Sequence, residues 1–220
     1  MSWTAPRTFV TAEIETSGIF NTHVRDNLFA TETAKAQAAG DLIYATGANA
    51  LARLPIGLGG KALRVNNAGT GLEWANVPTM VYKSANEIVN SSTTLQDDDA
   101  LFLPLAANEV WAFTLFLLYD SDAAADIKFA FTVPSGATLH ARRLWYSYDY
   151  ATILEGNYAA GDESPAGAPA SGTPISLRSR GVVINGANAG NLQLQWAQRV
   201  NTAVDTIVKK GSWLKATRLA

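Results

Sequence analysis

The chain has 220 residues, of which 48% are hydrophobic and 16% are charged, and its formal net charge is −2. This composition is typical of a globular protein with a neutral surface, and it does not indicate nucleic acid as a partner, because such binding usually needs a basic patch. The absence of cysteine excludes disulfides, thiolate metal ligands and cysteine nucleophiles.

Residues 1–39 predict an N-terminal segment with one helix. Thr16 or Ser17 is a favoured residue type for the N-cap, and the alanine-rich end of the segment runs into Gly40, which predicts a C-cap. An isolated helix of about 20 residues is marginal in water, so this segment needs a partner. Phe20, Val24, Asn27 and Thr31 share one face of the helix, with Ile19 and Leu28 beside it, so the apolar stripe is narrow and short.

Residues 40–78 predict a glycine-rich connector made of short strand pieces. Turn sequences at 46–47, 58–60 and 66–69 separate these pieces, which are too short and too few to bury both faces against each other. We expect sister copies of the same chain to supply the missing core; packing on the chain's own C-terminal domain is the alternative. The apolar residues of the pieces are Leu42, Tyr44, Leu51, Leu54, Ile56, Leu63, Val65, Leu72 and Trp74.

Residues 79–220 predict an antiparallel β-sandwich of the jelly-roll type. Lys128–Pro134 and Leu192–Gln198 alternate apolar and polar residues, which indicates sheet with one buried face. Eight to ten short strands with polar turns favour a sandwich or jelly roll, whereas the Gly-, Ala-, Ser- and Pro-rich run 156–172 predicts a long exposed loop. The expected strands are 80–82, 87–89, 101–105, 109–119, 126–133, 137–150, 175–184, 191–200, 206–209 and 211–219.

No segment predicts insertion into a membrane. The most apolar run, Val110–Tyr119, is shorter than the roughly 18 residues that a transmembrane helix needs, and it is typical of a buried strand. The N-terminal sequence MSWTAPRTFV lacks the charged and apolar regions of a secretory signal.

Three sets of motifs, in this order, resemble structural proteins of tailed-bacteriophage fibres and appendages, of the tail-fibre or head-fibre type. The first is WTAPRTFVTAEIETSGIFNTHVRDNL, and the second is GDLIYATGANALARLPIG followed by GKALRVN and GTGLEWA. The third is TTLQDDDALFLPLAANEVWAF with DIKFAFTVPSGATL and the closing KKGSWLKATRL. The resemblance covers nearly the whole chain. It implies a structural protein of the virion, usually a homotrimer, and leaves its position on head, tail or baseplate open.

The resemblance also suggests roles for the first two segments. Residues 1–39 are expected to attach the protein to other virion proteins (portal-, capsid- or tail-associated), with folding back onto the protein's own trimer as the alternative. Residues 40–78 are expected to form a three-fold stalk, in which glycine allows close approach of backbones. The candidate anchoring residues are Trp3, Pro6, Phe9, Phe20 and Val24, and the candidate trimer-interface residues are Leu42, Tyr44, Leu54, Ile56, Leu63 and Trp74.

An aromatic run at 145–150 is the candidate receptor site. With a period of two residues, Tyr146, Tyr148 and Tyr150 share one face, and Tyr158 follows in the expected loop. Exposed aromatic rings near acids and amides are a common way to hold sugars, so we expect a host-surface glycan as the ligand. The alternative is that these tyrosines line the core or a subunit interface.

We expect no enzymatic activity, no cofactor and no metal site. His23 and His140 lack triad partners at a known spacing, and the nucleophile motif G-x-S-x-G is absent. The run Asp97–Asp99 predicts a solvated turn, because consecutive carboxylates of an extended segment point in opposite directions.

The expected function is host-surface adhesion by a trimeric, N-terminally anchored virion protein. The alternatives are a head fibre or decoration protein without an essential receptor, and a free carbohydrate-binding module.

Overall fold

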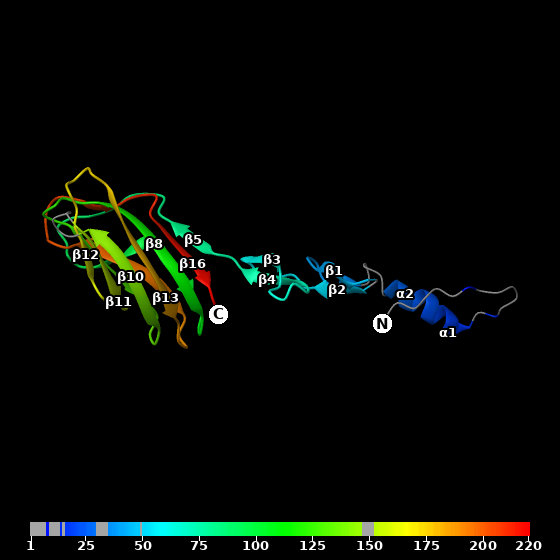
Figure 1. Ribbon diagram of the computed structural model, residues 1–220. Coiled ribbons are helices and arrows are strands. Elements are labelled where there is room, and N and C mark those ends of the chain that lie inside the picture. Colours follow the sequence, from blue (N-terminus) through cyan, green and yellow to red (C-terminus); the bar gives the residue numbers. More distant parts are fainter. Residues whose placement is uncertain (1–7, 9–13, 15, 30–34, 49, 147–151) are drawn as a thin grey trace. The chain divides into compact units, whose positions relative to one another are not determined.

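A computed structural model describes residues 8, 14, 16–29, 35–48, 50–146 and 152–220 (Figure 1). The chain divides into two compact units, Met1–Asn76 and Val77–Ala220.

The first unit begins with a short helical segment. It consists of α1 (Ser17–Phe20), a π-helical turn η1 (Asn21–Arg25) and α2 (Asp26–Phe29). Thr16 is the N-cap, and its side-chain oxygen accepts a hydrogen bond from the Ile19 amide at 3.3 Å. The expectation that Gly40 caps this helix is wrong, because residues 36–39 are not helical. Gly40 instead has a φ of +83° in the turn that leads into the first strand.

Two separate β-hairpins follow. The first pairs β1 (Leu42–Gly47) with β2 (Ala50–Leu54), and the second pairs β3 (Lys61–Val65) with β4 (Leu72–Asn76). The expected strand pieces lie in these hairpins except for Ile56, which lies in the connection between them. Each hairpin is a sheet of its own with only two strands.

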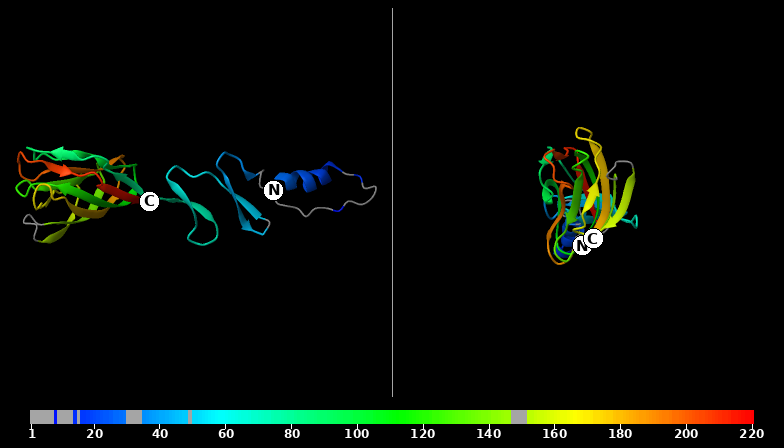
Figure 2. Two further views of the ribbon diagram at one scale, coloured as in Figure 1. Left: turned by 90° about the horizontal axis from the view of Figure 1, so that it is seen from above. Right: turned by 90° about the vertical axis from the view of Figure 1, so that its left-hand side faces the viewer.

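The second unit is an antiparallel β-sandwich, seen in two further views in Figure 2. The larger sheet contains β5 (Thr79–Tyr82), β6 (Glu87–Val89), β8 (Val110–Asp120), β10 (Thr138–Tyr146), β11 (Ile153–Tyr158), β13 (Ile175–Ile184), β15 (Thr206–Val208) and β16 (Trp213–Arg218). The smaller sheet contains β7 (Gln96–Leu105), β9 (Ile127–Thr132), β12 (Ser164–Ala166) and β14 (Gly190–Gln198).

The order of the strands is that of a jelly roll. Strands β11-β10-β13-β8 form one sheet and β12-β9-β14-β7 the other, so that from β7 to β14 the chain crosses between the sheets at every connection except β10 to β11 and closes two Greek keys. Strands β5, β6, β15 and β16 extend the larger sheet beyond β8. The expected mainly β, antiparallel sandwich is therefore confirmed.

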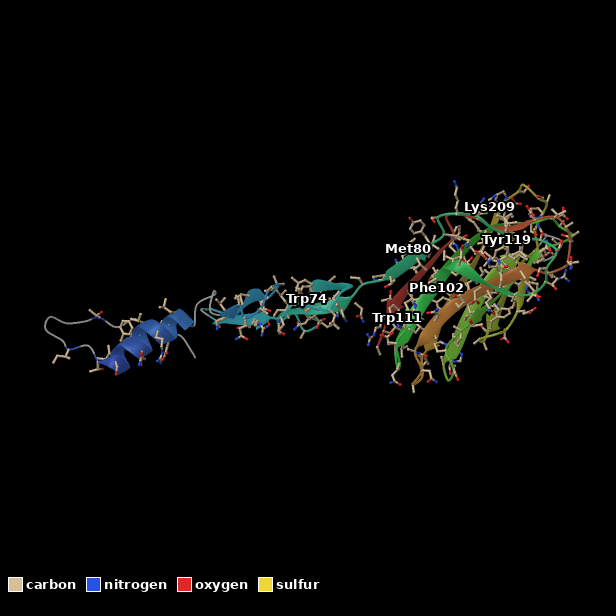
Figure 3. All side chains as sticks on the ribbon, turned by 180° about the vertical axis from the view of Figure 1, so that it is seen from behind. Trp74, Met80, Phe102, Trp111, Tyr119 and Lys209 are labelled. Atoms are coloured by element: carbon tan, nitrogen blue, oxygen red, sulfur yellow. The ribbon has the colours of Figure 1, made fainter. Side chains whose placement is uncertain are left out.

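The core lies between the two sheets and follows from the period-two patterns. In β8, Phe113, Leu115, Leu117 and Tyr119 are buried, and each alternates with a residue of the opposite face. The rings of Phe113 and Phe131 meet edge to face across the sheets with centroids 5.2 Å apart. The Tyr119 hydroxyl, inside the sandwich in Figure 3, donates to the carbonyl oxygen of Gly167 at 2.5 Å.

The run 156–172 is not the exposed loop that its composition predicts. It contains the end of β11 and the short strand β12, which pairs with β9 through Ser164 and Phe129. Ala166 and Ala168 are fully buried. Small residues allow this segment to lie close against the smaller sheet, and a strand built from small residues shows no hydrophobic period.

Candidate functional site

The face of the larger sheet that points away from the core carries large side chains in two neighbouring rows. Strand pairing aligns each row across β5, β16, β8, β13, β10 and β11, in that order. We call these the outer-face rows. The first consists of Met80, Lys215, Thr114, Arg180, Arg142 and Asn157, and the second of Tyr82, Trp213, Phe116, Arg178, Leu144 and Glu155.

The second row presents flat aromatic surface. The rings of Phe116 and Trp213 are stacked, with centroids 5.8 Å apart and an interplanar angle of 21°. The guanidinium carbon of Arg178 lies 5.6 Å from the centroid of Phe116, within the range of a cation–π contact. Beside Trp213, Tyr82 is 64% exposed. A solvent-facing sheet surface is ordinarily polar, so this concentration of aromatic residues is unusual.

Arginine residues occupy neighbouring positions of both rows. Arg142 and Arg180 lie directly opposite each other on β10 and β13, an arrangement of like charges that destabilises a sheet. Glu155 accepts hydrogen bonds from two nitrogens of Arg142. Within the described part of the chain, no carboxylate pairs with Arg178 or Arg180. The outer-face rows therefore form a locally cationic surface on a protein whose net charge is slightly negative.

Two hollows adjoin these arginines. The smaller has a volume of about 340 Å³ and the larger a volume of about 940 Å³, and Thr114, Arg142 and Arg180 line both of them. Leu144 and Arg178 complete the wall of the smaller hollow, together with Ser179. These volumes are in the range of small-molecule binding sites.

The four tyrosines predicted as a receptor site do not form one surface. Tyr146 is half-buried, and it follows the inward-facing Trp145, so it belongs to the opposite face of β10. Tyr158 lies on the inner face, where its ring is 5.5 Å from that of Trp145 and 4.3 Å from the guanidinium carbon of Arg143. Tyr148 and Tyr150 lie outside the described residues.

The outer-face arginines and the aromatic stack were not predicted from the sequence. The alternation in ISLRSRGVVI, residues Ile175–Ile184, places Arg178 and Arg180 on one face of a strand, and this signal was available. Which strands lie beside β13, and therefore which residues join these arginines, is a property of the sheet order.

The acidic run Asp97–Asp99 is part of β7, so the expectation of a solvated turn is wrong. Oxygen atoms of Glu87, Asp98 and Asp99 lie within 4.8 Å of one another, as in a metal site. However, the ammonium nitrogen of Lys83 contacts all three side chains, at 3.0 Å from Asp98 and 2.5 Å from Asp99. This ammonium group provides the positive charge that these carboxylates need.

The Lys83 cluster shifts the pKa values of its members in opposite directions. Burial disfavours the charge on Lys83, but hydrogen bonds to Asp99 and Glu87 outweigh burial and raise its pKa. Burial also raises the pKa of Glu87, whereas the hydrogen bond from Lys83 lowers the pKa of Asp99. The cluster joins the start of β6 to β7, which belongs to the other sheet.

The predicted trimer-interface residues lie in a part of the chain without a core. Between Lys35 and Tyr82, no residue that the structure describes is buried. Ile56 is 62% exposed and Leu63 is 43% exposed, while Leu42, Tyr44, Leu54 and Trp74 are half-buried.

Trp74 (Figure 3) already has a partner within its own chain. Its indole nitrogen donates to the carbonyl oxygen of Pro55 at 2.7 Å, and its ring covers Gly57 so closely that a Cβ atom there would lie 2.6 Å from it. The glycine at 57 therefore admits this tryptophan ring, and sister backbones are not needed to explain it.

The predicted anchoring residues are only partly described. Phe20 is 53% exposed and Val24 is 36% exposed on the helical segment. Trp3, Pro6 and Phe9 lie outside the described residues.

Comparisons with known proteins identify no family. No protein-family model and no curated protein sequence matches this chain. Among the described residues, no helix is long and apolar enough to span a bilayer.

Solved structures provide weak likenesses. One is a tripod from the baseplate of bacteriophage Tuc2009, with 12% identity, 98% of each chain covered and a TM-score of 0.30. Another is a carbohydrate-binding module of the β-sandwich superfamily, with 11% identity, 76% of this chain and 86% of that chain covered and a TM-score of 0.21. A third is a chain in the structure of infectious bursal disease virus, Gx strain, with 12% identity, 76% of this chain and 45% of that chain covered and a TM-score of 0.18. At these scores the functional conclusion depends on the residues of this chain.

Proposed function

We propose that this chain is a structural protein of a tailed-phage virion. In this proposal three copies form a fibre or appendage, the N-terminal segment attaches it to the particle, and the jelly-roll domain is displayed for adhesion to the host surface. The observation that carries the proposal is the stretch from Leu42 to Asn76, which forms two hairpins without one buried described residue.

Isolated two-stranded hairpins are at best marginally stable in water. The connector hairpins nevertheless present apolar side chains to solvent, and burial of such surface contributes roughly 25 cal/mol per Å². Sister copies related by a closed rotation would cover the same residues in every chain, because cyclic symmetry repeats one interface. The exposed large apolar residues of the hairpins and of the connection between them are Ile56, Leu58, Leu63 and Val65.

The motif resemblance and the N-terminal segment support the same proposal. The helical segment exposes Phe20 and Leu28, and of its described side chains only that of Asn27 is buried. A short helix with exposed apolar residues needs a partner surface to be stable. In the proposed function that surface belongs to another virion protein.

We propose further that the protein is not an enzyme. His140, the histidine that an enzymatic function would use, is exposed on the β10 strand two residues from Arg142. No hydrogen bond or ion pair to the imidazole ring of His140 occurs among the described residues, so nothing there orients the ring as a base.

The experiment that tests the trimer is a mass measurement of the purified full-length chain by light scattering. We expect about three times the chain mass of 23.4 kDa, and a substitution such as Leu63→Lys should reduce the mass toward one chain. The exposed Lys210→Gln provides a control outside the connector. A stable monomer of the unmodified protein would overturn the proposal.

A second experiment tests the anchor. Deletion of residues 1–39 should abolish incorporation into particles while the β-sandwich remains folded. A free carbohydrate-binding module would keep its full function after this deletion. A particle that incorporates the protein, but whose adsorption does not change when the protein is absent, would favour a head fibre or decoration protein.

A further inference from the structure

We infer that the outer-face rows bind an anionic glycan, that is, a saccharide chain bearing carboxylate or phosphate groups. The inference depends on the proposed adhesion function and names the chemical class of its ligand. It replaces the tyrosine site that the sequence predicts with a surface of β8, β10, β13 and β16.

The charges of the surface favour an anion. Arg178 and Arg180 are two residues apart on β13 and therefore project from the same face, about 7 Å apart along the strand. Arg142 lies opposite Arg180 on the neighbouring strand, about 5 Å away. Of these three arginines, only Arg142 has a carboxylate partner among the residues described, so the guanidinium groups of Arg178 and Arg180 keep their hydrogen-bond donors available.

Guanidinium groups suit this ligand class for a geometric reason. Their planar donors match a carboxylate or a phosphate in a bidentate way, and such charge-assisted bonds are stronger than neutral ones. A bound anion would also relieve the repulsion between Arg142 and Arg180, which the sheet otherwise tolerates at a cost in stability. Ligand binding therefore explains why Arg142 and Arg180 lie opposite each other, whereas the stability of the sheet does not.

The aromatic residues favour a sugar over a simple anion. Tyr82, which is 64% exposed, continues the row beside the stacked rings of Phe116 and Trp213, and the faces of aromatic rings carry partial negative charge that attracts the C–H groups of a saccharide ring. Thr114 and Asn157 add a hydroxyl and an amide in the row of Arg180, which suit saccharide hydroxyl groups. The smaller hollow, lined by Leu144 and the arginines, provides a surface against which the edge of a saccharide ring can pack.

The test measures binding of three defined probes to the full-length protein. These are an oligogalacturonate with one carboxylate per ring, a neutral galactose oligomer of the same length, and a glycerol-phosphate oligomer. The variant is Arg178→Gln/Arg180→Gln, and the matched control is Arg64→Gln, an exposed arginine of β3 that pairs with Glu73. The substituted arginines are exposed, and the double variant also removes the repulsion between Arg142 and Arg180, so no variant should have a lower unfolding midpoint than the unmodified protein.

We expect at least one acidic oligomer to bind more tightly than the neutral one, and the two acidic probes to distinguish carboxylate from phosphate. The double variant should lose about tenfold in affinity per arginine, whereas Arg64→Gln should stay within about twofold. Trp213→Ala should weaken the oligogalacturonate more than it weakens inorganic phosphate.

Several outcomes overturn the inference. They are no binding of either acidic oligomer, equal binding by the double variant, or equal losses in the double variant and in Arg64→Gln. Loss of the trimer in the double variant would also overturn it, because the surface would then be an interface between copies. If the protein is trimeric and particle-bound but does not bind acidic oligomers, this inference alone is refuted. If the protein is a monomer, the proposed function is refuted.

Discussion

Replacement of Lys83 by methionine should destabilise the β-sandwich by about 3–4 kcal/mol at pH 7. The side chain of Lys83 is 2% exposed and that of Asp98 is 0% exposed, so the substitution leaves a buried carboxylate without its counter-ion. An upper bound comes from protonation, because neutralising a carboxyl group of ordinary pKa at pH 7 costs about 4 kcal/mol. The expected loss in the free energy of unfolding is therefore close to the free energy needed to protonate one carboxylate of the cluster at pH 7.

The control is Asp99→Asn, which removes another partner of Lys83. The side chain of Asp99 is 74% exposed, and an exposed ion pair contributes only about 0–1 kcal/mol. Asp99→Asn should therefore change the free energy of unfolding by less than about 1 kcal/mol, even though its distance to the ammonium nitrogen is shorter than that of Asp98.

The assay is chemical denaturation of the full-length chain, followed by the fluorescence of buried tryptophans such as Trp196. The loss in the free energy of unfolding caused by Lys83→Met should become smaller as the pH falls to about 4, where a carboxylate is readily protonated. Since the pKa of Lys83 is raised above 10.5, its contribution is complete below that pH and is lost as the pH rises further. A loss below about 1 kcal/mol at pH 7, or a loss equal to that of Asp99→Asn, would refute this reasoning.

Three further predictions concern other parts of the chain. Gly181→Ala should cost about 2 kcal/mol or more by thermal unfolding, because its Cβ would lie 2.3 Å from the carbonyl oxygen of His140; an unchanged midpoint would contradict this. Arg143→Met should cost less than about 1 kcal/mol or even stabilise the sandwich, because burial lowers the pKa of Arg143 to about 10 and two of its nitrogens have no hydrogen-bond partner. A loss of more than about 2 kcal/mol would show that its contacts with the surrounding rings outweigh desolvation. Hydrogen bonds from Arg53 lower the pKa of Asp41 to about 2, so the contribution of this ion pair to stability is complete above pH 3.8 and is lost as the pH falls toward 2. The NMR signal of the Ala38 amide, which donates to Asp41, should therefore titrate near pH 2, and titration near pH 4 would refute the ion pair.

Patterns within one strand or turn could be predicted from the sequence because their causes are local. The strand Ile175–Ile184 has the predicted bounds, since its alternation matches the period of a strand with one buried face. The turns at 58–60 and 66–69 are also found, and Gly60 and Gly69 have φ values of +76° and +70°. Such values are readily adopted only by glycine, so the residue itself indicates the turn.

The candidate site could not be predicted in the same way. Arg142 and Arg180 meet because β10 pairs with β13, and Phe116 meets Trp213 because β8 pairs with β16. The alternation of each strand indicates which residues share a face, but it does not indicate the neighbouring strand. The tyrosine run was misleading for this reason, since Tyr158 arrives on the inner face by pairing opposite the buried Ala141.

From the sequence alone follow the N-cap of the helical segment, the turns at 58–60 and 66–69 of the connector and the mainly β class of the larger unit, because each depends on residues close together in the chain. The turn predicted at 46–47 is wrong, because both residues belong to β1. The tertiary structure decided that the run 156–172 contributes strands, that Asp98 meets Lys83 in the interior, and that two arginines without acidic partners lie beside an aromatic stack. These features arise from contacts between strands far apart in sequence, whose pairing is selected by the packing of the whole sandwich.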